Sequence, residues 1–367
     1  MSTKQILHMN PGQGDTSYAR NSTVQKTEQD RMKTLIIEAI TGLCGLSSTS
    51  PPKSMAIADL GCSSGPNALT LVSTTVDAIY RHCAQHAQPL PEICVFLNDL
   101  PNNDFNSIAK SLASLKYNHD DLADPVLITG MIPGSFYERL FPCNSLQFVC
   151  SSNGLHWLSK APEDLKESRL PMYDMDEQLR ISKRAVVANS YARQFKKDFT
   201  RFLNLRAQEL VPGGRMVISL YGRCSDNPTS KSNQAWQVVA VALNDMASRG
   251  IIDKEKLDSF YIPLYAPLEK EVNEIIEGEG SFKINKMQMR NPFSGMEDAL
   301  VGAKMIALAI RAVFESTIVF HFGSSDEIMD EFAMTVERNL SSGSGWRAVL
   351  AAEYPLVLLC LSLTRVI

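Results

Sequence analysis

The segment Met55-Ala56-Ile57-Ala58-Asp59-Leu60-Gly61-Cys62-Ser63-Ser64-Gly65-Pro66-Asn67 joins an apolar run to two glycines, with an acidic residue just before the first of them. We expect a β-strand to end at Leu60 and a helix to open at Asn67, with the glycines in the turn between them. Glycine allows positive φ and a close approach of the backbone to a ligand, and a helix N-terminus presents unpaired N–H donors. The segment is therefore typical of a nucleotide-type pocket.

The glycine spacing indicates which nucleotide. A dinucleotide loop needs three glycines as G-x-G-x-x-G to pass a pyrophosphate. Here only Gly61 and Gly65 are present, and Asp59 precedes the turn. The spacing disfavours a NAD-dependent dehydrogenase and predicts the D-x-G-x-x-x-G loop of an S-adenosylmethionine site.

Two further segments strengthen this interpretation. The run 96–101 is a predicted strand that ends in Asp99, a carboxylate that can accept hydrogen bonds from both ribose hydroxyls. Alone, an Asp before Leu-Pro is equally consistent with a turn. The run 130–137 follows another predicted strand and places Ser135 and Phe136 near the adenine.

Composition excludes several protein classes. The 367 residues are 44% hydrophobic and 21% charged, with a formal charge of −4 and no Lys/Arg cluster. These values predict a globular, soluble protein and no nucleic-acid partner. The eight cysteines form no C-x-x-C pair and no zinc-like spacing, so we expect reduced thiols and a cytoplasmic protein. The N-terminus has no signal-peptide core, and the apolar run 354–363 is too short to span a bilayer, so we expect no membrane association.

Strands and helices alternate along the chain. We expect strands over 55–60, 93–98, 126–129, 146–151, 215–221, 282–289 and 354–363. We expect helices over 21–43, 67–86, 104–115, 181–210, 233–248, 297–314 and 326–340. The alternation predicts an α/β fold with a mostly parallel sheet covered on both faces, and a ligand at the carboxyl ends of its strands.

Some segments look like additions to this core. Residues 162–182 are polar and irregular, and 290–297 form a Gly/Pro-containing loop before a helical run. We expect one unit over 1–367, with a core of about 50–160, 183–289 and 346–367, a helical cap of about 162–182 and 290–345, and an N-terminal lid of 1–25. The punctuation at 211–214 predicts a helix stop, and 341–345 a short link.

Motifs along nearly the whole chain resemble one plant family. They are His8-Met9-Asn10, Gly12-x-Gly14, Ser17-Tyr18-Ala19-x-Asn21-Ser22-x-x-Gln25, the runs 58–67, 96–105, 133–142, 151–162, 194–223 and 260–267, and His321-Phe322-Gly323. In this order they resemble the SABATH methyltransferases, which include salicylate and benzoate carboxyl methyltransferases and theobromine synthases. The resemblance implies a Rossmann-like S-adenosylmethionine-dependent core with an α-helical cap.

The resemblance also implies site residues. By position, the cofactor contacts would be Tyr18, Ser22, Asp59, Cys62, Asn67, Asp99, Leu100, Ser135, Phe136 and Ser152. Gln25 and Trp157 would grip the acceptor carboxylate and so act as the catalytic pair. The acceptor ring would lie among Asn153, His156, Trp236, Tyr265, Ile310 and Leu356. Without the motifs, Gln25 would be read as a solvated helix residue, and Trp157, Trp236 and His156 as core.

Such a pocket would need little acid–base chemistry. A carboxylic acid with a pKa of about 4 is already ionised at neutral pH, so no general base is required. Aligning the carboxylate oxygen with the donor methyl can contribute roughly 7 to 11 kcal/mol, and a closed cap would exclude water. Gln25 and Trp157 donate through uncharged N–H groups. We hypothesise that a buried Arg would instead blunt the carboxylate by pairing with it.

Departures from the family pattern bear on the acceptor. Asn153 stands where many relatives have Tyr, and Ile310 and Leu356 where they have Met or an aromatic residue, which implies a roomier, more polar pocket. Benzoate, salicylate and anthranilate are therefore all candidates, and one missing wall shifts discrimination by only about 1 to 3 kcal/mol. Asn10 replaces a frequent Lys near the lid. The alternatives are jasmonate or indole-acetate as acceptor, a ring nitrogen of a xanthine-like heterocycle, or ligand binding without catalysis.

Two implications of the resemblance concern metal and assembly. Some relatives carry a magnesium site matched here by Asp258 and Phe260, but Tyr261 and Ser168 replace two expected Asn residues. Two oxygen ligands are thereby altered, which disfavours octahedral Mg²⁺. The resemblance also implies a homodimer.

Overall fold

The apolar run before Gly61 forms strand β1 (Ser54–Leu60), which lies inside a seven-stranded sheet. The computed structural model describes residues 7–45, 52–113, 126–224, 236–296, 302–323, 326–341 and 356–366. Its other strands are β2 (Glu92–Asp99), β3 (Leu127–Pro133), β4 (Leu146–Ser152), β5 (Leu210–Arg223), β6 (Phe282–Arg290) and β7 (Leu356–Arg365). All seven predicted strands are confirmed.

The sheet order is β3-β2-β1-β4-β5-β7-β6. The pairings between these strands are parallel except those of β7, which runs antiparallel to both β5 and β6. Strand order reverses between β1 and β4, and in open α/β sheets ligands bind outside the carboxyl ends of the strands at such a point. The predicted mostly parallel α/β sheet is therefore confirmed, and its switch point is the turn after β1.

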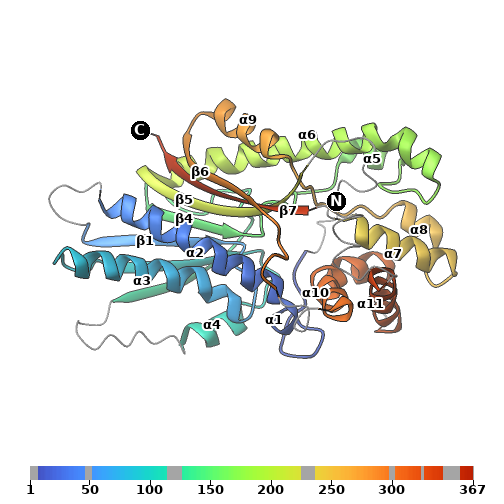
Figure 1. Ribbon diagram of the computed structural model, residues 1–367, viewed down its shortest axis with the longest axis horizontal. Coiled ribbons are helices and arrows are strands. Elements are labelled where there is room, and N and C mark those ends of the chain that lie inside the picture. The colour runs from blue at the N-terminus through green and yellow to red at the C-terminus, as the bar shows by residue number, and fades with distance from the viewer. Residues whose placement is uncertain are drawn as a thin grey trace.

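Helices cover both faces of this sheet (Figure 1). They are α1 (Tyr18–Asn21), α2 (Thr23–Cys44), α3 (Thr70–Gln85), α4 (Phe105–Ala113), α5 (Glu163–Glu167), α6 (Glu177–Glu209), α7 (Gln237–Ser248), α8 (Lys254–Asp258), α9 (Glu269–Glu279), α10 (Ala303–Phe322) and α11 (Asp326–Leu340). Helices α2 and α3 pack on one face, and α6 and α9 lie on the other. The apolar stripe along α2, which includes Met32 and Ile36 at helical spacing, is buried.

Helix α6 links the sheet to the helical end of the molecule. Its 33 residues make it about 50 Å long. It begins at Glu177, four residues before the predicted start, because the Asp176 carboxylate caps the N–H groups of Gln178 and Leu179. Residues 162–182, expected to be irregular, thus contain α5 and the first turn of α6. Near its other end Phe195, Phe199 and Phe202 are buried, with the ring centroids of Phe195 and Phe199 5.4 Å apart.

The junction between α6 and β5 differs from the prediction. The segment 211–214 lies inside β5 rather than before it, and the β4–β5 register shifts between Leu146 and Phe148. Gly213 takes a φ of 76°, which only glycine adopts readily. The predicted helix stop is confirmed, because α6 ends at Glu209, but the strand starts earlier than predicted, in a bulge. Helix α9 was not predicted, because Val272, Ile275 and Ile276 give its charged sequence only a short buried stripe.

Helices α7, α8, α10 and α11 gather at the end of the molecule away from the C-terminus (Figure 1). Helix α7 packs on α11, although the predicted division placed 183–289 in the core. Parts of four predicted elements, namely 114–115, 233–235, 297–301 and 354–355, and most of the link 341–345 lie outside the described residues. Helix α10 extends to Phe322 rather than 314 and stops before Gly323, which has a φ of 103°.

By length and apolar composition α10 meets the criteria for a membrane-spanning helix. It packs on α11 and α1, however, and carries the buried Arg311. Arg311 pairs with Glu315 at 2.8 Å and with Asp330 of α11 at 2.5 Å. These contacts are those of a helix inside a folded cap. All eight cysteines lie in the described residues and are free.

Candidate active site

The turn after β1 and the end of β2 form one structure. The N–H groups of Gly61 and Cys62 both donate to the Asn98 carbonyl at 2.9 Å. The Asp99 carboxylate accepts from the N–H of Ser63 and of Leu100, each at 2.7 Å. The two strongest sequence signals for a cofactor therefore meet at the switch point. Burial raises the pKa of Asp99 to about 6, and the two N–H donors partly offset this effect.

Asp59 lies inside the sheet rather than on the lip of the turn. It is 1% exposed, is paired with Cys150 in the strand register, and its Oδ2 has no hydrogen-bond partner among the described residues. Burial raises its pKa to about 7. Cys62 is likewise buried, and its sulfur contacts the Ser63 carbonyl at 3.5 Å. Both residues line the underside of the turn.

Helix α1 closes the other side of the glycine turn. Gly65 has φ 86° and ψ −168°, and a Cβ at this position would lie 2.8 Å from the Cβ of Ala19. Ser22 accepts from Asn67 Nδ2 at its hydroxyl, at 2.8 Å, and at its carbonyl, at 3.1 Å. Tyr18 is buried next to this contact. The structure thus brings the N-terminal and glycine-turn predictions together.

Ser135 and Phe136 lie on the loop after β3, which folds back over the glycine turn. A Cβ at Gly61 would lie 3.4 Å from the Phe136 ring, so the ring covers this glycine. Ser135 stabilises the loop through its hydroxyl, which accepts from the Tyr137 N–H at 3.2 Å. The Tyr137 hydroxyl in turn donates to the Trp157 carbonyl at 2.7 Å.

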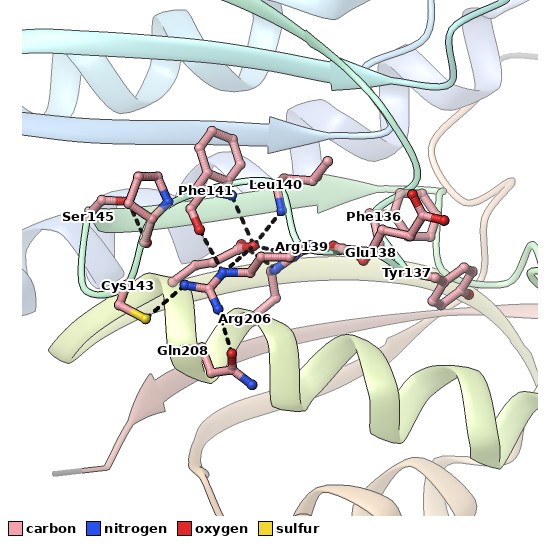
Figure 2. Close-up of polar contacts among 12 residues, drawn as sticks. Phe136, Tyr137, Glu138, Arg139, Leu140, Phe141, Cys143, Ser145, Arg206 and Gln208 are labelled. Carbon is pink, nitrogen blue, oxygen red and sulfur yellow. Dashed lines mark hydrogen bonds and ion pairs between the residues drawn. The ribbon is translucent and has the colours of Figure 1, made fainter.

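A buried ion pair on α6 anchors this loop (Figure 2). Arg206 and Glu209 are both 0% exposed and pair at 2.8 Å. Arg206 donates to the carbonyls of Phe136 and Glu138, and Glu209 Oε1 accepts from the N–H groups of Leu140 and Phe141. Sequence analysis missed this pair because nothing in a helical sequence indicates that two of its charges meet in the core.

The turn after β4 carries the predicted acceptor residues. Asn153 has a φ of 55°, and its N–H donates to the Ser219 carbonyl at 3.0 Å. Its Nδ2 donates to Ser152 Oγ at 3.3 Å and to Oε2 of Glu28 at 2.6 Å. Glu28 lies on α2, three residues after Gln25. This hydrogen bond therefore joins the helix that bears Gln25 to the turn that bears Trp157.

Glu28 was not predicted as a site residue. It is 0% exposed, and burial raises its pKa to about 7, against hydrogen bonds from Tyr221 and Asn153. A signal was available, because Glu28 precedes Met32 by four residues and so belongs to the apolar stripe of α2. Gln25 itself is half-buried, and its Oε1 has no partner among the described residues.

His156 and Trp157 are buried on the same turn. Burial lowers the pKa of His156 to about 3, and its Nδ1 accepts from the Tyr221 N–H at 3.2 Å. His156 is therefore a neutral imidazole that serves as a wall. Trp157 lies against Phe314 of α10, with ring centroids 5.4 Å apart, so its indole reaches the cap.

The remaining acceptor candidates differ in what they offer. Trp236 is buried beside Tyr191, and its Nε1 has no partner in the described part of the chain. The Tyr265 hydroxyl is already bound to Glu271 at 2.8 Å and Arg223 at 2.9 Å, so only its ring is free to contact an acceptor. Ile310 on α10 and Leu356 at the start of β7 are half-buried.

The residues at the predicted magnesium site do not fit a metal. Asp258 is half-exposed and pairs with Lys254 at 2.5 Å. Phe260 is buried against His321 and Phe322 and supplies no side-chain oxygen. No group of three or more His, Cys, Asp or Glu able to hold a metal occurs in the described ranges.

The residues fit S-adenosylmethionine better. Asp59 Oδ2, Ser63 Oγ and Asn98 Oδ1 are buried polar atoms without partners in the described residues, and all surround the glycine turn. Leaving such atoms unsatisfied is costly, so a polar ligand at the turn is expected. Asp99 would meet the ribose and Phe136 the adenine.

Comparison with known proteins identifies the family of the chain. The family model of SAM dependent carboxyl methyltransferases matches residues 4–366. The chain is 40% identical over 370 residues to jasmonate O-methyltransferase of Arabidopsis thaliana, covering 92% of this chain and 94% of that one. It is 38% identical over 355 residues to salicylate carboxymethyltransferase of Clarkia breweri, covering 93% and 95%.

Among solved structures, loganic acid methyltransferase with SAH is similar over 98% of both chains, with a TM-score of 0.81 and 30% identity. The match spans the sheet, the glycine turn and the cap. With this geometry and these relatives, the chain belongs to the SABATH family of S-adenosylmethionine-dependent carboxyl methyltransferases.

Proposed function

We propose that the acceptor is a small aromatic acid, of the benzoate, salicylate or anthranilate type, and that the product is its methyl ester. The observation that carries this proposal is the Glu28–Asn153 hydrogen bond, which holds Gln25 and Trp157 on two adjoining elements. We assign the acceptor walls to the buried aromatic side chains of His156, Trp236 and Tyr265. These walls suit a planar ring.

Gln25 and Trp157 orient the acid. Their uncharged N–H groups donate to the carboxylate without forming an ion pair, so an oxygen lone pair stays available for attack. S-adenosylmethionine, when bound, would supply a methyl carbon for such an oxygen to attack, with the thioether S-adenosylhomocysteine as the leaving group. In this proposal the cofactor is positioned by Tyr18, Ser22, Asn67, Asp99, Leu100 and Ser152. Ser135 and Phe136 contact the adenine, and Asp59 and Cys62 lie beneath the turn. Phe314 and Trp157 exclude water where the cap meets the core.

Jasmonate is the second candidate acceptor. Its support is the 40% identity to a protein named jasmonate O-methyltransferase, against 38% to one named for salicylate. Half-buried Ile310 and Leu356 leave aliphatic walls on which a non-planar acid can pack. Indole-acetate, a ring nitrogen acceptor and binding without catalysis are the further alternatives. The proposal includes no Mg²⁺, because Asp258 and Phe260 do not fit it.

Two variants test the roles of the carboxylate grip. Gln25→Leu and Trp157→Phe each remove one N–H donor to a carboxylate while keeping most of the packing. Such a bond is worth about 1.5 to 3 kcal/mol, so kcat/KM for the acid should fall by about 10- to 100-fold. The affinity for S-adenosylhomocysteine, measured by calorimetry, should stay within about twofold.

The wild-type protein should first be incubated with labelled S-adenosylmethionine and benzoate, salicylate, anthranilate, jasmonate and indole-acetate. Extraction of neutral esters gives the rank order. The proposal is supported if benzoate, salicylate or anthranilate is esterified most efficiently. If jasmonate is esterified most efficiently, jasmonate becomes the assigned acceptor instead. Loss of cofactor binding in both variants would refute the assigned roles of Gln25 and Trp157. We also propose a cytoplasmic homodimer, which sedimentation of the purified protein tests for assembly.

A further inference from the structure

Glu28 presents an unsatisfied carboxylate oxygen beside the proposed acceptor site. The residue is 0% exposed, and only Oε2 is engaged by Asn153. Its Oε1 is buried and has no hydrogen-bond partner in the part of the chain that the structure describes. A carboxylate oxygen is costly to bury unless a donor satisfies it. A donor on a bound ligand would do so.

Asn153, like Glu28, has a buried hydrogen-bond acceptor available to a ligand. Its amide nitrogen is used by Glu28 Oε2 and Ser152 Oγ, whereas its Oδ1 is buried without a partner among the described residues. The backbone at Asn153 is fixed by its bond to the Ser219 carbonyl. When Glu28 is ionised, both free atoms of the Glu28–Asn153 pair are therefore hydrogen-bond acceptors. An unsubstituted apolar ring would satisfy neither.

The surrounding charges leave this preference in place. Arg31, the basic group that acts on Glu28, donates to the carbonyls of Asn291 at 3.1 Å and Pro292 at 3.0 Å, and to that of Ser294. Its guanidinium thus secures the loop after β6 rather than Oε1 of Glu28. Tyr221 also hydrogen-bonds to the carboxylate without satisfying Oε1.

We propose that Glu28 and Asn153 form a subsite that binds a hydrogen-bond-donating substituent, a primary amine or a hydroxyl, on the acceptor acid. The inference deepens the proposed function and rests on it. Glu28 follows Gln25 by three residues, about 4.5 Å along the axis of α2. An acid held at Gln25 therefore extends its ring substituent toward Glu28. A primary amine offers two N–H donors for the two free acceptors, and a hydroxyl offers one.

The variant Glu28→Gln tests the subsite by changing polarity at constant shape. In the pair of amides that results, one of the two ligand-facing acceptors becomes an N–H donor, whichever way the amides are turned. A ligand with two N–H donors then meets one acceptor and one donor in place of two acceptors. Glu38→Gln is the control, because it makes the same change on the same helix at a half-exposed residue paired with Lys286.

The ligands are matched pairs that differ only in an amino or a methyl group, at the ortho, meta and para positions of benzoate. Calorimetry measures their binding to protein saturated with S-adenosylhomocysteine, and ester formation gives kcat/KM. In the wild type and in Glu38→Gln, at least one of the aminobenzoates should be preferred over the methylbenzoate with the same substitution position by about tenfold or more. In Glu28→Gln that preference should fall to about twofold. The affinities for benzoate and for S-adenosylhomocysteine should each change by less than about threefold.

Three results would overturn the subsite. One is a wild type that shows no amino-over-methyl preference at any position, a result independent of whether the variant folds. The second is an equal loss for every acid, benzoate included, in Glu28→Gln. The third is a loss of affinity for S-adenosylmethionine but not for S-adenosylhomocysteine, which lacks the sulfonium charge. That result would assign Glu28 to the binding of the sulfonium. Failure of the wild type to esterify or bind any acid would overturn the proposed function as well.

Discussion

Asp99 serves both the fold and the proposed cofactor site. Its carboxylate already fixes the Ser63 and Leu100 N–H groups, so the turn is organised before any ribose arrives. This arrangement lowers the ordering cost of binding. It also makes the charge of Asp99 a condition for recognition.

Cofactor affinity should consequently fall in acid. Burial raises the pKa of Asp99 to about 6, so the ionised form is present above this pH and is lost as the pH drops through it. A ligand that needs the carboxylate as acceptor should bind about tenfold more weakly for each pH unit below 6. Calorimetric titration with S-adenosylhomocysteine between pH 5 and 7.5 measures this.

Asp99→Asn provides the comparison. The ratio of the two affinities cancels the pH dependence that Glu28 contributes, since both proteins keep this group and Asp99 does not act on its pKa. The ratio should be large at pH 7.5 and shrink toward pH 5. A ratio that stays constant with pH would exclude Asp99 as the acceptor for the ribose.

Gly65 is a second residue on which the turn depends. Gly65→Ala would force a side chain into φ 86° and place its Cβ 2.8 Å from the Cβ of Ala19. Either the turn or α1 must shift, and we expect both lower thermal stability and at least about tenfold weaker cofactor binding. Gly278→Ala is the matched control. It lies in α9 with open space around its Cβ, so the change should stabilise the protein by about 0.5 to 1 kcal/mol.

At the scale of elements, α6 fixes the loop after β3, which carries Ser135 and Phe136. Arg206 and Glu209 form a buried pair whose remaining donors and acceptors bind the backbone between Phe136 and Phe141. The helix therefore sets where Ser135 and Phe136 lie, although neither residue belongs to it.

Removing one partner should be expensive. Arg206→Met leaves the Glu209 carboxylate buried without its ion-pair partner, and we expect a loss of about 3 to 5 kcal/mol of unfolding free energy by urea denaturation. Cofactor affinity should fall at the same time because Phe136 loses its anchor. Lys270→Met, which removes the exposed pair with Glu274 on α9, should cost less than about 1 kcal/mol. Similar losses for the two variants would contradict a positioning role for Arg206.

At the scale of the whole molecule, the N-terminal segment joins the core to the cap. The Asn10 N–H donates to the Ala312 carbonyl of α10 at 2.9 Å, and its side chain donates to Glu315 at 2.8 Å. The Asn10 carbonyl accepts from the Tyr18 N–H at 3.0 Å. The predicted lid is thus hydrogen-bonded to the cap helix and to α1. Asn10, noted in the sequence for replacing a frequent Lys, is the residue that makes these contacts.

The sequence by itself determined the strands, their order of appearance and the glycine turn, because each of these depends on residues close together in the chain. The pattern from Ala56 to Gly65 needs only a strand period and two glycines to be recognised. The carboxylate at the end of β2 follows from the same local logic. For this reason the family and the glycine turn itself were predicted correctly from motifs.

The tertiary structure decided which of the polar residues face one another. Nothing local relates Glu28 to Asn153, which are 125 residues apart, or sends Arg206 to the backbone of a loop 70 residues before it. The early start of β5 was likewise set by pairing with β4, which extends the strand back to Leu210, whereas Pro212 and Gly213 by themselves indicate only the helix stop. Burial, a property of the assembled core, is the main cause of the raised pKa values of Glu28, Asp59 and Asp99.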